Sequence, residues 1–312
     1  MPIKLFIAMT LTLILLFSLL FGILAAISYY FELPIWTSVI LAILLVFFQW
    51  LIGPKIIWWT INMRLMTKKE YPWIWRFVEK TCEEKRVPIP KICIARIGAP
   101  NAFVFGRTPS TSTLVLTIGL LRNLNKEEIK AVIGHELGHV KHKDCIIMTI
   151  VSAIPIIAYF VSRSLIFGRV RGERKGGMAV LFGLGAFLVY FITNLLVLAL
   201  SRLREYYADK FGAETTKPSL LARALAKITY GLSINPELKN SAIRSFFIAD
   251  PITAKREISA LKNAYSDFVL EEKELKKAME WEKKNPLLHV LELLSSHPLT
   301  YKRILALKEM ER

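Results

Sequence analysis

The feature of this sequence that most constrains its fold is a set of four long apolar runs that contain almost no charge. They span residues 5–30, 33–53, 145–161 and 178–200. A helix needs about 20 apolar residues to cross the hydrocarbon core of a bilayer, and all but the third run reach that length. The third run is shorter and contains Pro155, which can kink a helix. The pattern predicts a polytopic α-helical membrane protein built around two hairpins.

The composition supports a membrane location and argues against a nucleic-acid partner. The chain has 312 residues, 54% of them hydrophobic, and a formal net charge of +17. Such a charge is typical of nucleic-acid binding, but the cytosolic flanks of membrane helices also collect Lys and Arg. We therefore expect a multi-pass protein of the cell membrane, in contact with the lipid bilayer, with residues 54–144 and 201–312 in the cytosol. The basic loop 162–177 would then lie outside, so whether residues 145–166 and 178–200 cross completely stays open.

The region between the two hairpins has a mixed α/β pattern. Helical spacing of apolar residues predicts a helix over 72–85. Alternating β-branched and aromatic residues predict short strands over 91–96 and 101–106. Residues 109–121 predict a turn followed by a further strand.

A helix that begins after Asn125 carries the residues with the clearest chemistry. Asn125 is a favourable N-cap, and Glu128 three residues later completes a capping box. On this helix His135 and His139 are four residues apart and therefore share a face. Glu136 lies beside the first histidine, in the H-E-x-x-H arrangement of zinc proteases, where glutamate is the general base. The motif predicts one zinc ion per subunit and hydrolysis of peptide bonds.

A catalytic zinc needs a third protein ligand, and the sequence offers three candidates. A metzincin would need glycine at position 142 and histidine at position 145, but this chain has His142 and Cys145, so that pattern fails. His142 lies one turn further on and points elsewhere, so we expect a basic interfacial residue there. After the last apolar run, Glu205 and Asp209 share a helix face; Glu205 would bind zinc and Asp209 would hold a histidine's other nitrogen. The alternative for Glu205 is a surface acid paired with Arg202 or Arg204. A hairpin of the last two runs would return the chain to the side it left and bring Glu205 to the histidines. The scattered cysteines argue against a thiolate site.

Together these segments resemble the HtpX group of membrane zinc metalloproteases, relatives of the CAAX prenyl protease. The resemblance covers nearly the whole chain, in family order, through "PNAFVFGRTPSTSTLVLTIGLL", "NKEEIKAVIGHELGHVKHKD", "SRLREYYAD" and "SSHPLTYKRI". It implies a gluzincin-type, mainly α-helical protease domain with a small β-sheet. It also implies metal ligands at His135, His139 and Glu205, with Glu136 as the base, and an active site that faces the cytosol.

The resemblance extends to residues around the motif. The strand that borders the cleft in this family matches Asn101, Ala102 and Phe103. An edge strand can bind an extended peptide by β-augmentation, so we expect substrate contacts there. His297 matches a histidine near the substrate oxyanion, which it would stabilise, and Arg303 matches a residue that orients the site. The chain departs from the family pattern at Leu299, where the family usually has a second proline.

The expected organisation has four parts: a transmembrane hairpin (1–53), the first half of a protease domain (54–144), a second transmembrane or membrane-embedded hairpin (145–200) and the second half of the protease domain (201–312). We expect an endopeptidase that cleaves misfolded or damaged membrane proteins, or unfolded proteins. The nearest alternative is a CAAX-type processing protease, although four spans are fewer than that family uses. A non-catalytic scaffold or sensor with a structural metal is an alternative of another class, and Glu136 argues against it because a structural site needs no general base. The sequence does not reveal the oligomeric state or the role of the charged segment 236–285.

Overall fold

The computed structural model describes residues 35–167, 177–234 and 279–311, together with residues 11, 12, 15 and 19. This part of the chain is mostly helical and contains one small mixed β-sheet. It divides into two compact units. The first consists of Met1–Gly53 with Ile146–Leu203, and the second of Pro54–Cys145 with Arg204–Arg312.

Three long helices contribute to the first unit: α2 (Ile35–Thr60), α6 (Asp144–Phe167) and α7 (Gly177–Thr215). Large apolar side chains on α2 and α7 are exposed, among them Phe47, Phe48, Leu181, Leu184, Phe187 and Leu188. Among the described residues, one helical stretch, Leu181–Thr215, is long and apolar enough to cross a membrane. A second is found only if α6 is counted together with the preceding α5 (Lys126–Lys141), although the two are bent by 63° at the break. The multi-pass arrangement therefore stays a prediction.

Helices α6 and α7 pack against each other as an antiparallel hairpin. Buried side chains early in α6 contact buried side chains late in the apolar part of α7: Val151, Ile154, Val197 and Leu200. Further along, the Ser162 hydroxyl donates a hydrogen bond of 2.9 Å to the carbonyl oxygen of Gly183. Pro155 lies inside α6, which continues through it.

The second unit contains a sheet with the strand order β1-β2-β4-β3. The strands are β1 (Met63–Leu65), β2 (Lys91–Ala95), β3 (Ala102–Phe105) and β4 (Thr113–Thr117). β2 and β4 are parallel, whereas β1 pairs with β2 and β3 pairs with β4 in antiparallel fashion. The predicted strands over 91–96 and 101–106 are confirmed, while β1 was not predicted. β3 is an edge strand of this sheet.

The turn and the strand predicted within 109–121 are confirmed, but the helix at the end of this stretch was not predicted. A 3-10 turn over Pro109–Thr111 precedes β4, and the short helix α4 (Ile118–Asn123) follows it directly. The strand ends because the Thr117 side chain accepts a hydrogen bond of 3.1 Å from the backbone N–H of Leu120, which caps the new helix.

The remaining helices of the second unit are α3 (Pro72–Lys85), α5, α8 (Pro218–Ile234), α11 (Pro286–Leu293) and α12 (Thr300–Glu309). The predicted helix over 72–85 and the capping box of α5 are both confirmed. In that box, Asn125 Oδ1 accepts from the N–H of Glu128, and Glu128 Oε2 accepts from the N–H of Asn125. α5 packs against β3, α3 and α8, and α12 packs against α8. The H-E-x-x-H helix therefore lies in the core of this unit rather than on its surface.

Some predictions concern residues outside the described part of the chain. They are most of the first apolar run, residues 168–176 of the basic loop, and residues 236–278 of the charged segment.

Candidate metal centre

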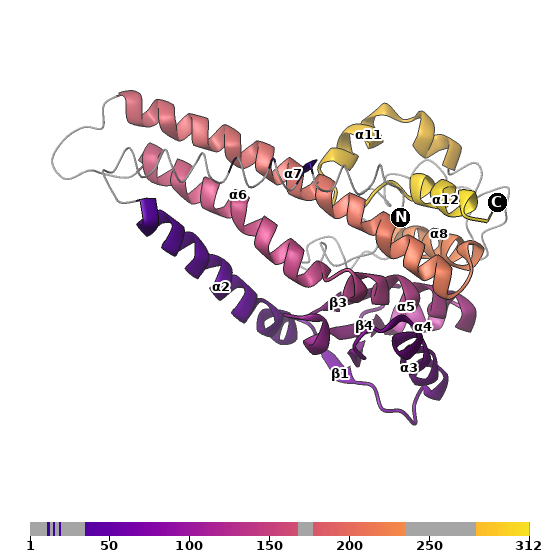
Figure 1. Cartoon of the computed structure of the whole chain (residues 1–312). Helices are drawn as coiled ribbons and strands as arrows, with labels where there is room; N and C mark the ends of the chain where they lie inside the picture. The colour runs from indigo at the N-terminus through magenta and orange to yellow at the C-terminus, as the bar shows by residue number, and fades with distance from the viewer. Residues whose placement is uncertain are drawn as a thin grey trace. The chain divides into compact units, whose positions relative to one another are not determined.

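The site forms where α5 packs closely against α7. α7 is a single helix of 39 residues, so the fourth apolar run and the segment with Glu205 are continuous (Figure 1). An added Cβ on Gly138 would lie 2.9 Å from Ala208 Cα, and one on Gly212 would lie 2.9 Å from the backbone nitrogen of His135. Glycine at these positions allows the two helix backbones to approach so closely. The approach brings Glu205 next to the histidines of α5.

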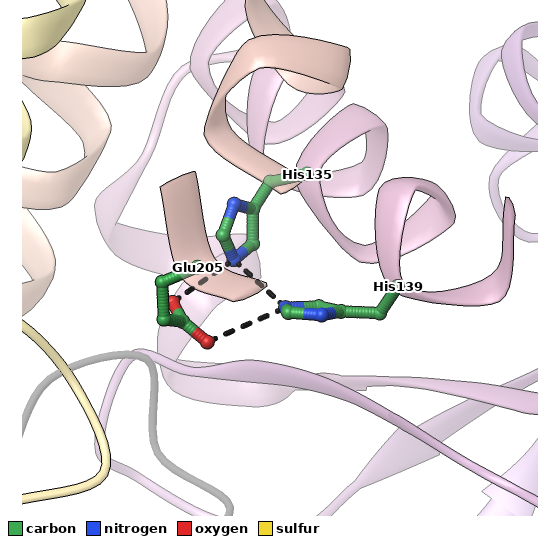
Figure 2. A group of neighbouring side chains, drawn as sticks. All are labelled: His135, His139 and Glu205. Carbon is green, nitrogen blue, oxygen red and sulfur yellow. Dashed lines mark hydrogen bonds and ion pairs between the residues drawn. The ribbon is translucent and has the colours of Figure 1, made fainter. Parts of the chain in front are cut away.

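Three side chains from these helices converge on one point (Figure 2). His135 Nε2 lies 3.2 Å from His139 Nε2 and 3.5 Å from Glu205 Oε2. His139 Nε2 lies 3.5 Å from Glu205 Oε1. His135 and Glu205 are almost fully buried, at 1% and 4% exposure.

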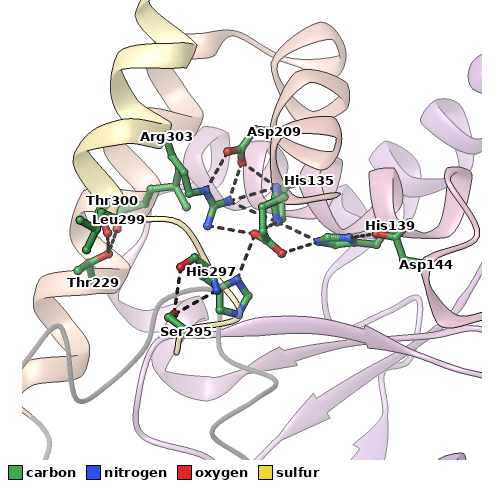
Figure 3. A network of polar contacts seen from close by, with 12 residues as sticks. His135, His139, Asp144, Asp209, Thr229, Ser295, His297, Leu299, Thr300 and Arg303 are labelled. Atoms are coloured by element: carbon green, nitrogen blue, oxygen red, sulfur yellow. Dashed lines mark hydrogen bonds and ion pairs between the residues drawn. The ribbon is translucent and has the colours of Figure 1, made fainter. Parts of the chain in front are cut away.

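The opposite nitrogen of each histidine contacts a carboxylate (Figure 3). His135 Nδ1 lies 2.9 Å from Asp209 Oδ1, and His139 Nδ1 lies 2.7 Å from Asp144 Oδ2. A neutral imidazole that donates from Nδ1 presents a lone pair at Nε2. The structure therefore places Asp209 where the sequence suggested and adds Asp144, which sequence reasoning missed.

The contacts among His135, His139 and Glu205 fit a bound metal ion. His135 Nε2 and His139 Nε2 face each other at 3.2 Å while both Nδ1 atoms contact carboxylates, so a cation between the two Nε2 atoms is favoured. Glu205 Oε2 is buried and has no hydrogen-bond partner in the described part of the chain. Ligand atoms at about 2.1 Å from a tetrahedral zinc lie about 3.4 Å apart, close to the observed separations. A metal ion would thus satisfy the facing imidazole nitrogens and Glu205 Oε2, whose other contacts are ion pairs with His297 and Arg303.

Arg303 of α12 joins the site from a third helix. Its Nε and Nη2 donate to the two carboxylate oxygens of Asp209 at 2.8 and 2.6 Å, and Nη1 lies 3.2 Å from Glu205 Oε2. Burial alone would raise the pKa of Glu205, but the charges of His297 and Arg303 hold it well below its usual value. Burial would likewise raise the pKa of Asp209, and Arg303 lowers it. Both carboxyl groups are therefore ionised at neutral pH.

Glu136 is 3% exposed and lies near enough to His135, His139, Glu205 and His297 to interact with their charges. Burial raises the pKa of its carboxyl group above the usual value. A carboxylate in such surroundings accepts a proton more readily than a solvated one.

His297 lies in the loop between α11 and α12. Its Nδ1 is 3.2 Å from Glu205 Oε2, and neither ring nitrogen forms a hydrogen bond with the described residues. The loop is held by Ser295, whose hydroxyl contacts the backbone N–H and C=O of His297. It is also held by Glu292, which accepts a hydrogen bond of 3.1 Å from the N–H of Leu299. A proline at position 299 could not make that bond, so the departure from the family pattern has a structural use here.

The three residues expected to contact substrate are buried. Asn101, Ala102 and Phe103 are 1%, 0% and 4% exposed, and the Phe103 side chain packs in an apolar cluster with Phe105 and Val115. In this conformation their side chains belong to the core.

The structure corrects two details of the basic residues. The ring of His142 packs against Tyr207 and Phe211, with centroids 5.5 and 6.2 Å apart, and burial lowers its pKa. His142 is thus not the basic interfacial residue we expected. Arg204, the alternative surface partner of Glu205, is buried in an ion pair with Asp144.

Comparison with known proteins agrees with this geometry. Residues 68–311 match peptidase family M48. Over 233 residues the chain is 40% identical to a protease HtpX homolog of Methanothermobacter thermautotrophicus, covering 74% of this chain and 88% of that protein. Over 280 residues it is 35% identical to a protease HtpX homolog of Aeropyrum pernix, covering 85% and 83% of the two chains. The crystal structure of S. mikatae Ste24p has a similar fold, with a TM-score of 0.55 at 18% identity, covering 98% of this chain and 67% of that one. The chain therefore belongs to peptidase family M48 and is a metalloprotease related to the HtpX homologs.

Proposed function

We propose that this metalloprotease is a zinc endopeptidase in which His135, His139 and Glu205 hold one zinc ion per subunit. One observation carries the proposal: the three ligand atoms converge in a buried site, while carboxylates hold the outer nitrogens of both histidines. Two imidazoles and a carboxylate form a known ligand set for catalytic zinc and leave a position open.

In the proposed mechanism Glu136 moves the proton. Zinc bound there would polarise the scissile carbonyl and lower the pKa of a water that it binds. The Glu136 carboxylate accepts the proton that the attacking water loses as its oxygen bonds to the carbonyl carbon. It then gives this proton to the amine nitrogen as the C–N bond breaks.

His297 and Arg303 have separate proposed roles. The Nε2 atom of His297 is buried and has no hydrogen-bond partner among the described residues, so it can donate to the oxyanion that develops on the substrate. Arg303 touches Asp209 and Glu205 and fixes the position and charge of both. Asp209 in turn orients His135.

We propose that an extended substrate segment pairs with the edge strand β3 through backbone groups. Because the residues of β3 are largely buried, this pairing requires a conformation in which the strand edge is more accessible. The proposed substrates are misfolded or damaged membrane proteins and unfolded proteins.

The proposed location is the cell membrane, with several membrane crossings and the active site in the cytosol. The four-part organisation into 1–53, 54–144, 145–200 and 201–312 belongs to the same proposal. It is supported by the exposed apolar side chains of α2 and α7 and by the excess of Lys and Arg in the chain.

The test is the substitution Glu136→Gln in the full chain, purified in detergent. The amide keeps the size of the side chain but cannot take the proton, so cleavage of an unfolded reporter should fall by about 10²–10⁴-fold while zinc content stays at one per chain. Glu128→Gln is the matched control, because Glu128 is a buried carboxylate on the same helix that does not touch the ligands. Wild-type activity in Glu136→Gln would contradict the mechanism.

The similarity in fold to Ste24p favours keeping one alternative, a CAAX-type processing protease. Cleavage of prenylated C-terminal peptides in preference to an unfolded membrane-protein fragment would support that alternative.

A further inference from the structure

A buried ion pair lies directly beside the proposed metal ligands and is not explained by the mechanism above. Asp144 is the first residue of α6, and Arg204 precedes Glu205 on α7. The Arg204 Nη2 donates to Asp144 Oδ1, while Asp144 Oδ2 contacts His139 Nδ1 at 2.7 Å. Arg204 is 4% exposed and Asp144 is 8% exposed. The carboxylate therefore bridges a guanidinium on one helix and a proposed ligand on another.

Arg204 also supports the break between α5 and α6. Its Nη2 donates a hydrogen bond of 2.6 Å to the backbone carbonyl oxygen of His142, the C-cap residue of α5. The next residue, Lys143, has a positive φ of 58°, which is an uncommon backbone conformation for a residue other than glycine. This contact fixes the turn that delivers Asp144 to His139.

A second ion pair that uses a buried carboxylate of α5 provides a structural comparison. Glu128 is 2% exposed and pairs with Lys227 of α8 at 2.8 Å, near the opposite end of α5. It ties two helices together but contacts none of the proposed ligands. The Asp144–Arg204 pair differs from it by the contact with His139 and by the burial of both partners.

We propose that Asp144 and Arg204 form a positioning pair for His139, in which Asp144 fixes the imidazole with its proton on Nδ1 and Arg204 fixes Asp144. The ring is then held with Nε2 directed at the metal position before the metal arrives. The inference rests on the proposed metal site.

Substitutions should therefore change metal binding and not only stability. Loss of a group that orients a metal ligand typically costs 10–100-fold in metal affinity or activity. Asp144→Asn keeps an acceptor oxygen but loses the charge, and we expect a loss in zinc affinity of about 10-fold. Asp144→Ala loses both, and we expect about 100-fold. Arg204→Gln should weaken binding through Asp144, so its effect should largely disappear in a chain that already carries Asp144→Ala.

The experiment measures zinc affinity of the full chain in detergent by competition with a chromophoric chelator. The absorption spectrum of the cobalt-substituted protein reports the ligand field at the same site. Glu128→Gln is the control, and it should lower thermal stability while leaving zinc affinity and the cobalt spectrum unchanged.

Three results would overturn the inference. The first is wild-type affinity and spectrum in Asp144→Asn and Asp144→Ala, and the second is an equal loss of affinity in Glu128→Gln. The third is additive effects of Arg204→Gln and Asp144→Ala. If Asp144→Ala does not fold, the nearly isosteric Asp144→Asn decides the matter alone. Failure of the wild-type chain to bind zinc would instead refute the proposed function, and with it the metal site on which the pair acts.

Discussion

The close contact between α5 and α7 should control the metal site, and Gly138→Ala tests this. Gly138 lies between the two histidines in sequence, and an added Cβ would be 2.9 Å from Ala208 Cα and 3.1 Å from Phe211 Cβ. Carbon atoms pack comfortably at about 3.5–4.0 Å, so the helices must separate locally by roughly 0.6–1.1 Å. Metal–ligand distances tolerate only about 0.2 Å of change. The substitution should therefore weaken zinc binding and proteolysis strongly.

The effect on stability should be much smaller. Overpacking costs about 1–3 kcal/mol, while replacing glycine by alanine inside a helix returns about 1 kcal/mol. We therefore expect the free energy of unfolding to fall by about 0–2 kcal/mol. Gly185→Ala on α7 is the matched control, because nothing lies within 4 Å of its added Cβ.

The assay compares denaturant unfolding, zinc affinity by chelator competition and cleavage of an unfolded reporter in both variants. Gly138→Ala with wild-type zinc affinity and activity would refute the idea that this helix contact sets the geometry of the site.

Three further predictions concern single groups. Arg303→Lys keeps the charge but loses the bidentate contact with Asp209. Zinc affinity should therefore fall by about 10–100-fold. Unchanged zinc affinity in the chelator assay would contradict an orienting role for Arg303. His297→Gln should lower kcat by about 10²–10³-fold with little change in KM, and steady-state kinetics would contradict the oxyanion role if KM alone rose. In the metal-free site, burial lowers the pKa of His139, but Asp144 and nearby carboxylates raise it to about 9. At neutral pH a proton then occupies His139 and must leave before a metal binds. The apparent zinc affinity should therefore rise by about tenfold per pH unit up to that pKa. A zinc affinity that stays flat between pH 6 and about 8 would contradict this coupling.

Much of the site follows from local sequence. The capping box at Asn125 and Glu128, and the four-residue spacing of His135 and His139, depend only on helix geometry. Glu205 could be chosen because the short connection between the last two apolar runs implies a hairpin. That hairpin is present as α6 and α7.

The features that sequence reasoning missed depend on contacts between distant residues. Asp144 meets Arg204 only because the chain turns between α5 and α6 through a residue with positive φ, and no local pattern predicts that turn. β1 was missed because three residues are too few to show alternation. The short helix α4 was missed because Thr117 ends the strand by capping a helix, a role that apolar patterning does not reveal.

Gly134 and Gly138 lie inside α5, where glycine is unfavourable. Their cost in helix propensity indicates either close packing or substrate approach. The structure shows that close packing is the reason, because Gly134 and Gly138 both face α7.

The most direct test of the central claim is X-ray absorption at the zinc edge on the full chain, compared with Glu205→Gln. The account predicts an inner shell of two imidazole nitrogens and at least one oxygen at about 2.0–2.2 Å, with the oxygen contribution altered in Glu205→Gln. A shell that contains sulfur at about 2.3 Å, or a spectrum that Glu205→Gln leaves unchanged, would contradict it.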